Sequence, residues 1–250
     1  MITFWKKATV LILLTVSTVF ANAQTSLYQV GIGVGAYIYQ GDLTPTRIGS
    51  LATMKPGINL YGSRLLTSSL SARLQLSIAR LKGDDAKYSH PEYRQQRNFN
   101  FTTPLVEAAA SIVWNPLRSN FDGIRAPRLT PYLSAGVGLS WVRINRDYSN
   151  FNPAYFGSES WVVAGLNTDI AHRTPRLLPV IPVGAGLQYE LTPQWSLTAD
   201  ASYRFTFSDY LDGFSQAANP ALKDRYFSTS IGIQYKIGSD RGIKCPVVRN

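Results

Sequence analysis

The side chains best suited to chemistry are two histidines, and their settings argue against catalysis. His90 stands in Ser-His-Pro and His172 in Ala-His-Arg, both within polar, irregular stretches. Hydrolysis at a lipid surface would need a nucleophile next to a base, and neither histidine belongs to such an arrangement. We therefore interpret both as surface residues, and we expect that the protein is not an enzyme.

Two further motifs suggest ligand binding only at first sight. Asp84 and Asp85 resemble the start of a calcium loop, but the spaced oxygen ligands of such a loop do not follow. They are interpreted as the solvated end of a strand. Gly31-x-Gly33-x-Gly35 alternates inside a strand-like run and lacks the helix that a bound phosphate needs. The sequence thus predicts neither a metal nor a cofactor.

The first residues have the features of an export signal. Lys6 and Lys7 precede an apolar run over residues 8–20, which closes on Ala21-Asn22-Ala23. This pattern is typical of a secretory signal peptide, so residues 1–23 are expected to be removed. No cysteine stands directly after the cleavage site, which argues against an N-terminal lipid anchor. No second run of about 20 apolar residues follows, which excludes a helical membrane span.

The remaining chain consists of short segments in which apolar and small polar residues alternate. Alternation with a period of two is typical of strands that have one apolar face. In the last segment Phe227, Ile231 and Tyr235 share a face, and Ser228 and Gln234 share the other. The eight segments are 28–39, 56–65, 70–81, 99–114, 131–143, 180–191, 195–207 and 226–237.

The eight segments predict an antiparallel, up-and-down outer-membrane β-barrel over residues 24–237, followed by a periplasmic tail over 238–250. Long connections alternate with shorter ones, and the even strand count places both termini in the periplasm. The face opposite the apolar one is rich in Gly, Ser and Thr, which suits a narrow lumen. A soluble β-barrel or sandwich is the alternative. Aromatic residues near the strand ends predict a girdle at the membrane interfaces: Trp114, Trp141, Tyr189, Trp195, Tyr203 and Tyr235.

A few charged residues of both signs lie on the small-residue face. Eight strands enclose a lumen that side chains just fill, so a general porin is not expected. We predict structural ion pairs here, and the alternative is a path for protons or solutes. The residues are Arg73, Glu107, Glu190, Asp200, Arg204 and Lys236.

The positive charge of the chain suggests its partners. The formal charge is +10, from 25 Lys+Arg against 15 Asp+Glu. An exported chain rarely meets nucleic acid, so lipopolysaccharide or an acidic protein is expected instead. Cys245 is the single cysteine, and the sequence allows either a free thiol or an intermolecular disulfide at this position. A mild basic excess lies on the periplasmic side, which is either a partner contact or a solvated rim: Arg118, Arg125, Arg128, Arg241 and Lys244, with Cys245 beside them.

Several segments resemble the eight-stranded outer-membrane barrels of Bacteroidota that include PorG, a component of the type IX secretion system. The Gly41-Asp42-Leu43 and Asp209-Tyr210-Leu211-Asp212 loops are the distinctive ones. The resemblance implies a non-catalytic anchor that holds a periplasmic ring of the PorK lipoprotein and PorN to the outer membrane. A surface adhesin or ligand-binding barrel, acting through its long loops, is the alternative. The segments that carry the resemblance are 39–43, 97–101 with Glu107, 131–138, 182–187 and 207–212.

Overall fold

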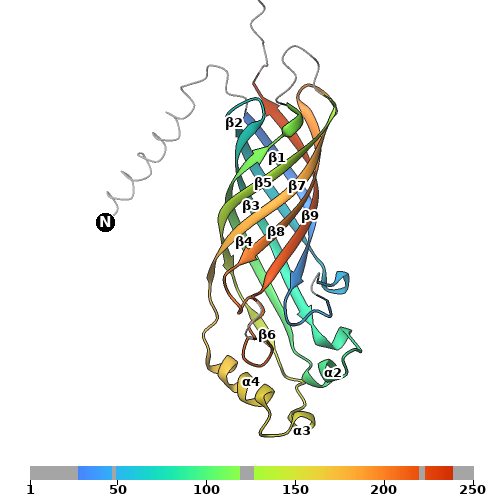
Figure 1. The fold of residues 1–250 in the computed structure, drawn as a ribbon, viewed down its shortest axis with the longest axis vertical. Coiled ribbons are helices and arrows are strands. Elements are labelled where there is room, and N and C mark those ends of the chain that lie inside the picture. Colours follow the sequence, from blue (N-terminus) through green and yellow to red (C-terminus); the bar gives the residue numbers. More distant parts are fainter. Residues whose placement is uncertain (1–27, 47–48, 119–126, 220–222, 239–250) are drawn as a thin grey trace, which may run out of the picture.

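The strands of the chain close into one barrel (Figure 1). The structure is a computed structural model that describes residues 28–46, 49–118, 127–219 and 223–238. Those residues form nine strands: β1 (Tyr28–Gln40), β2 (Lys55–Leu65), β3 (Leu70–Asp84), β4 (Asn100–Trp114), β5 (Leu129–Val142), β6 (Asn145–Asp147), β7 (Leu177–Glu190), β8 (Trp195–Thr206) and β9 (Arg225–Ile237).

Each strand pairs antiparallel with its neighbour, from β1 with β2 round to β9 with β1. β6 has only three residues and pairs with the start of β4, where it extends the wall formed by β5. Eight strands therefore enclose the lumen, and the predicted fold class is confirmed. All eight predicted segments are strands, with ends that differ from the prediction by at most three residues.

The two faces of the wall differ as the alternation predicted. Val34 and Ile231 are paired partners on the outer face and are 56 % and 68 % exposed, whereas Gln234 points inward and is 1 % exposed. An outer face of this kind matches the apolar band of a membrane barrel. The predicted girdle residues Trp114, Trp141, Tyr189, Trp195 and Tyr235 lie on that face and are exposed.

Among the described residues, no helix combines the length and the apolar character needed to cross a membrane.

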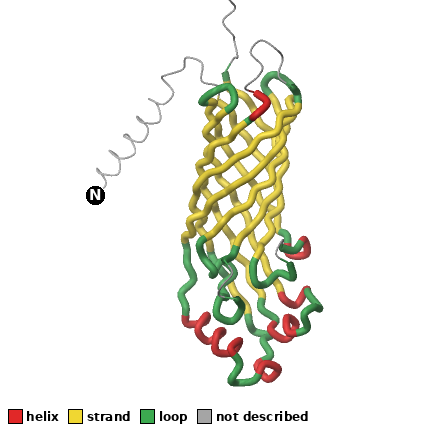
Figure 2. Tube along the Cα trace, in the orientation of Figure 1, coloured by secondary structure: helices red, strands yellow, loops and turns green. Residues whose placement is uncertain are grey.

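The barrel has two unlike ends, which Figure 2 shows clearly. The end that carries Tyr28 and Ile237, here called the terminal end, has the tight turns 66–69 and 191–194 and the 3-10 helix η3 (Pro116–Arg118). The opposite end, here called the loop end, carries the longer connections 41–54, 85–99, 143–176 and 207–224. The predicted alternation of long and short connections is thereby confirmed, with 115–128 as the long exception.

The long connections of the loop end, which include the polar stretches around His90 and His172, are ordered. Their described residues fold into a compact cap. Its core is aromatic, with Phe99 stacked on Phe214 at 4.3 Å between ring centroids. Tertiary packing orders connections that have little periodicity of their own. The helices of the loop end are η1 (Leu51–Thr53), η2 (Asp85–Lys87), α2 (Tyr93–Arg97), α3 (Pro153–Phe156) and α4 (Trp161–Ala171).

Candidate functional site

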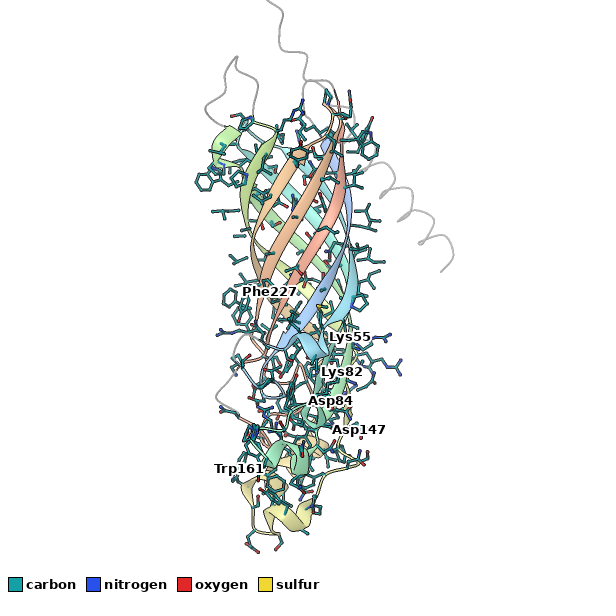
Figure 3. The ribbon with its side chains drawn as sticks, turned by 90° about the vertical axis from the view of Figure 1, so that its right-hand side faces the viewer. Lys55, Lys82, Asp84, Asp147, Trp161 and Phe227 are labelled. Carbon is teal, nitrogen blue, oxygen red and sulfur yellow. The ribbon has the colours of Figure 1, made fainter. Side chains whose placement is uncertain are left out.

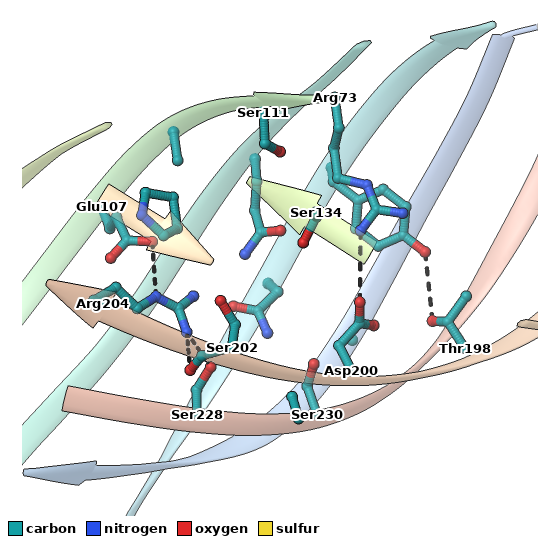
Figure 4. Close-up of a pocket in the computed structure, with 17 residues that line it drawn as sticks. Arg73, Glu107, Ser111, Ser134, Thr198, Asp200, Ser202, Arg204, Ser228 and Ser230 are labelled. Carbon is teal, nitrogen blue, oxygen red and sulfur yellow. Dashed lines mark hydrogen bonds and ion pairs between the residues drawn. The ribbon is translucent and has the colours of Figure 1, made fainter. Parts of the chain in front are cut away.

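The six charged residues predicted for the lumen form three ion pairs, two of which appear in Figure 4. Each pair joins strands that are not neighbours in the sequence, because the alternation turns all six side chains inward. The prediction of structural pairing is confirmed. The pairs are Arg73 Nη1 with Asp200 Oδ1 at 3.5 Å, Arg204 Nε with Glu107 Oε1 at 3.4 Å, and Lys236 Nζ with Glu190 Oε1 at 3.7 Å.

The Arg204–Glu107 pair is completely enclosed. Its side chains are 2 % and 1 % exposed. Arg204 Nη1 also donates to the carbonyl of Ser202 at 3.1 Å and to Ser228 Oγ, and Tyr226 OH donates to Glu107 Oε2. A buried charge is tolerated only when it is paired and its polar atoms are bonded, which is the arrangement here.

A second layer surrounds Arg73, nearer the terminal end. The guanidinium lies over the rings of Tyr61 and Tyr132, at 4.4 and 5.3 Å from their centroids. The hydroxyl of Tyr132 donates to Asp200. A Cβ on Gly31 would overlap the Tyr61 ring, so this glycine leaves room for a lumen tyrosine. Packing therefore explains this part of the alternating glycine motif.

The two layers leave little free space between them. The lumen cavity between Arg73 and Arg204 measures about 40 Å³, room for only a few water molecules. Its lining includes Glu107, Asp200 and the small residues Ser134 and Ser230. The described lumen is thus a packed polar core.

The cap contains a second buried charge cluster. Asp85 is fully buried, and Arg94 Nη1 and Arg97 Nη2 reach its Oδ1 at 3.0 and 3.1 Å. Arg97 Nε donates to Asp85 Oδ2 at 2.7 Å. The interpretation of Asp84 and Asp85 as a solvated strand end is therefore wrong for Asp85. Two arginines from α2 fold over the carboxylate and exclude water from it.

A tyrosine and two carboxyl groups meet at the junction of cap and barrel. The hydroxyl of Tyr39 lies 2.7 Å from Asp212 Oδ2 and 2.5 Å from Asp224 Oδ1. Burial, and then the neighbouring Asp224 carboxyl, raise the pKa of Asp212 well above its ordinary value, and burial also raises the pKa of Asp224. One phenol proton cannot serve two carboxylates, so one of the two acids keeps its own proton.

Another carboxylate ties the β8–β9 connection to α4. Asp169 is fully buried, and its two oxygens accept hydrogen bonds from the backbone N–H groups of Ser215, Gln216 and Ala217 at 2.9–3.1 Å. Such bonds to a charged acceptor are roughly twice as strong as neutral ones. The connection after β8 is therefore fastened across the mouth of the barrel.

The residues predicted to contact a partner are only partly within the described chain. Arg118 is the last residue of η3, and Arg128 is exposed just before β5, so both belong to the terminal end. Arg125, Arg241, Lys244 and Cys245 lie outside the described residues. A disulfide through Cys245 and a shared partner surface stay predictions.

The histidines lie at the loop end on different connections. His90 is exposed between β3 and β4, and His172 stacks on Tyr210 with ring centroids 4.0 Å apart. Among the described residues, no group of three or more His, Cys, Asp or Glu side chains is arranged to hold a metal ion.

Comparison with protein families assigns the chain to one of them. A family model described as a domain of unknown function, DUF6089, matches residues 6–229. The chain belongs to this family. The DUF6089 match covers β1 to β8 and the first residues of β9, and with them the cap and the Arg73–Asp200 and Arg204–Glu107 pairs, while Lys236 lies beyond it. No relative is found among curated proteins.

Solved structures similar to this DUF6089 barrel include outer-membrane proteins of three bacterial groups. Ail, the attachment invasion locus protein of Yersinia pestis, is 13 % identical in its complex with sucrose octasulfate (TM-score 0.45). Neisserial surface protein A is 18 % identical (TM-score 0.45). A major outer membrane protein from Thermus thermophilus is 12 % identical (TM-score 0.46). Each match covers 86 % of this chain and all of the other.

The buried charges of the cap are the part of the DUF6089 barrel that sequence reasoning missed. One of the buried carboxyl groups, Asp212, lies in a loop that carries the family resemblance, whereas Asp85, Asp169 and Asp224 lie outside those segments. The only sequence feature that could have indicated these buried carboxyl groups is the presence of aspartates in loops that also contain glycine and leucine. The sequence gives no indication that the loops meet one another.

Proposed function

We propose that the chain is a non-catalytic outer-membrane barrel that anchors a periplasmic ring, of the PorK lipoprotein and PorN, as in type IX secretion. The observation that carries the proposal is the packed lumen with its three ion pairs. A barrel filled in this way is no conduit, so its two ends are the surfaces available for work. The resemblance to PorG-like barrels supplies the class of partner.

The terminal end supports docking of an acidic periplasmic protein. Its described residues include four basic ones, Arg64, Arg118, Arg128 and Lys236, and one acidic residue, Glu190. Lys236 and Glu190 pair with each other, whereas Arg64 and Arg128 are exposed. Complementary charge of this kind mainly speeds association and selects the partner. With both termini in the periplasm, this rim would face the ring.

The ordered cap favours a second function, that of a ligand-binding barrel or adhesin. The long connections are not floppy loops but a packed unit with exposed aromatic residues, including Tyr155 at 54 % and Trp161 at 63 %. Exposed aromatic side chains are common at recognition surfaces. In this alternative the cap contacts the ligand, and the terminal end is an inert rim.

A co-purification experiment separates the two functions. The tagged full chain is extracted from native membranes in mild detergent, beside a chain truncated after Gly238, an Arg64→Gln/Arg128→Gln variant and a Tyr155→Ala/Trp161→Ala variant. We expect PorK and PorN with the full chain and the cap variant, and about tenfold less with the two terminal-end changes, because each lost interfacial charge weakens association.

The opposite pattern decides against the anchor. If the ring proteins are absent from every sample, or if they remain with both terminal-end variants, the anchoring role is wrong. Loss of a co-purifying surface ligand from the cap variant alone would favour the adhesin. Heat-modifiable gel mobility confirms that each variant is folded before it is compared.

A further inference from the structure

A cleft of about 770 Å³ opens at the loop end, where the cap meets the outer wall of β8 and β9. Its walls come from the connection after β1, from α2, from the start of α4 and from the connection before β9. The lining combines cations with aromatic side chains: Arg94, Arg97, Lys223 and Arg225 with Trp161 and Tyr203.

The cleft has more positive charge than its own acids neutralise. Asp85 supplies one negative charge to the two arginines of α2, and the buried Nε of Arg94 has no hydrogen-bond partner among the described residues. Lys223 and Arg225 are exposed and form no ion pair within the described chain, although the carboxyl of Asp209 lies close enough to interact with the charge of Lys223. Asp42 also lines the cleft, where it accepts a hydrogen bond from the backbone of Asn219 at 2.8 Å.

One mouth of the cleft reaches the membrane-facing surface. Arg225 points outward with its guanidinium 5.5 Å from the ring of Phe205, and Tyr203 packs edge-on against the same ring at 4.9 Å. Phe205 belongs to the apolar outer face and is 38 % exposed. In Figure 3 the nearby Phe227 lies where the strands approach the cap, and Trp161 lies in the cap itself. The cleft therefore spans the boundary between apolar wall and polar cap.

We propose that this cleft binds the phosphate group of an anionic membrane lipid. Lys223 and Arg225 hold the phosphate, and the acyl chains lie along Tyr203 and Phe205. Charge-assisted bonds from Lys and Arg are the usual way that proteins hold phosphate, and aromatic side chains favour the headgroup level of a bilayer. A soluble anion would not need the lipid-facing mouth. The inference is independent of the anchor, which uses the other end of the barrel.

Native mass spectrometry of the full chain in phosphatidylcholine nanodiscs tests the site, with bisphosphorylated lipid A as the probe and its dephosphorylated form beside it. Lys223→Gln/Arg225→Gln should bind lipid A about 30-fold more weakly, since each cation near an anionic lipid contributes roughly fivefold in affinity. The matched control is Lys55→Gln/Arg80→Gln. These two cations lie at the same end, on β2 and β3, and neither lines the cleft.

The outcomes are distinct. The proposal is supported if the cleft variant alone loses binding of lipid A and if the dephosphorylated lipid binds weakly to the unchanged protein and to both variants. Equal weakening of both variants indicates general surface attraction and overturns it. Unchanged binding by the cleft variant also overturns it, as does displacement of lipid A by millimolar inorganic phosphate, which would identify a soluble anion as the ligand.

Discussion

Replacing Glu107 with alanine should destabilise the barrel more than any rim substitution. The change leaves the Arg204 side chain in place, 2 % exposed, with hydrogen bonds to Ser202 and Ser228 but with no negative charge beside it. Removing one partner of a buried ion pair lowers the free energy of unfolding by about 3–5 kcal/mol. Tyr226 keeps Ser140 as a hydrogen-bond partner at 2.8 Å, so the uncompensated charge dominates the loss.

The lumen supplies its own control for this prediction. Glu190 pairs with Lys236 at 3.7 Å near the terminal end, where their side chains are 31 % and 15 % exposed. Glu190→Ala should lower the free energy of unfolding by about 1 kcal/mol or less, because water replaces the lost partner. Urea titration of the barrel in lipid vesicles, followed by tryptophan fluorescence and by heat-modifiable gel mobility, measures both values.

A double variant distinguishes lost charge from lost packing. Glu107→Leu/Arg204→Met removes both charges at similar volume, so it should unfold less readily than Glu107→Ala alone. A loss of less than about 1 kcal/mol in the free energy of unfolding of Glu107→Ala would contradict this prediction. A double variant less stable than the single one would also contradict it, because packing rather than pairing would then be decisive.

Two further predictions concern packing and pH. Gly31→Ala should lower the free energy of unfolding by about 1–3 kcal/mol through overlap with Tyr61, whereas Gly62→Ala, with no atom within 4 Å of the new methyl, should have little effect; equal urea midpoints would contradict this. Burial raises the pKa of Asp42 from 3.8 to about 6. The folded state therefore favours the protonated acid, which contributes up to ~3 kcal/mol to the free energy of unfolding. That contribution is full below pH 4 and is lost as the pH rises through 6. Proteolysis of the cap should therefore quicken between pH 4 and 7, and Asp42→Asn should reduce that difference; an undiminished difference would assign it to other groups.

The barrel could be predicted because its wall is a local pattern. Side-chain direction in a strand depends only on position, so the alternation of Phe227 and Ser228 separated an apolar face from a small polar one. The same rule sent Glu107 and Arg204 inward, although 97 residues separate them. With few charges inside and water excluded, pairing was the only low-energy arrangement available to them.

The cap could not be predicted because its contacts are not local. Asp85 follows a strand and looks solvated in sequence, and its partners Arg94 and Arg97 lie on a helix of five residues, too short to give a periodic signal. Only the folded connections bring Asp169 beneath the residues 215–217 that it holds. Burial of a charge is a property of the assembled loops, which an isolated stretch of sequence does not reveal.

Buried polar contacts occur both in the lumen and where the barrel meets the cap. Tyr39 of β1 donates to the cap carboxyl groups of Asp212 and Asp224, and Tyr226 of β9 donates to Glu107 in the lumen. The hydrogen bonds of Asp85 and Asp169 likewise hold the described connections of the loop end in an ordered cap. The lipid site that we propose lies beside this ordered cap, at Arg225, whereas the protein contact that we propose lies at the opposite, basic terminal end.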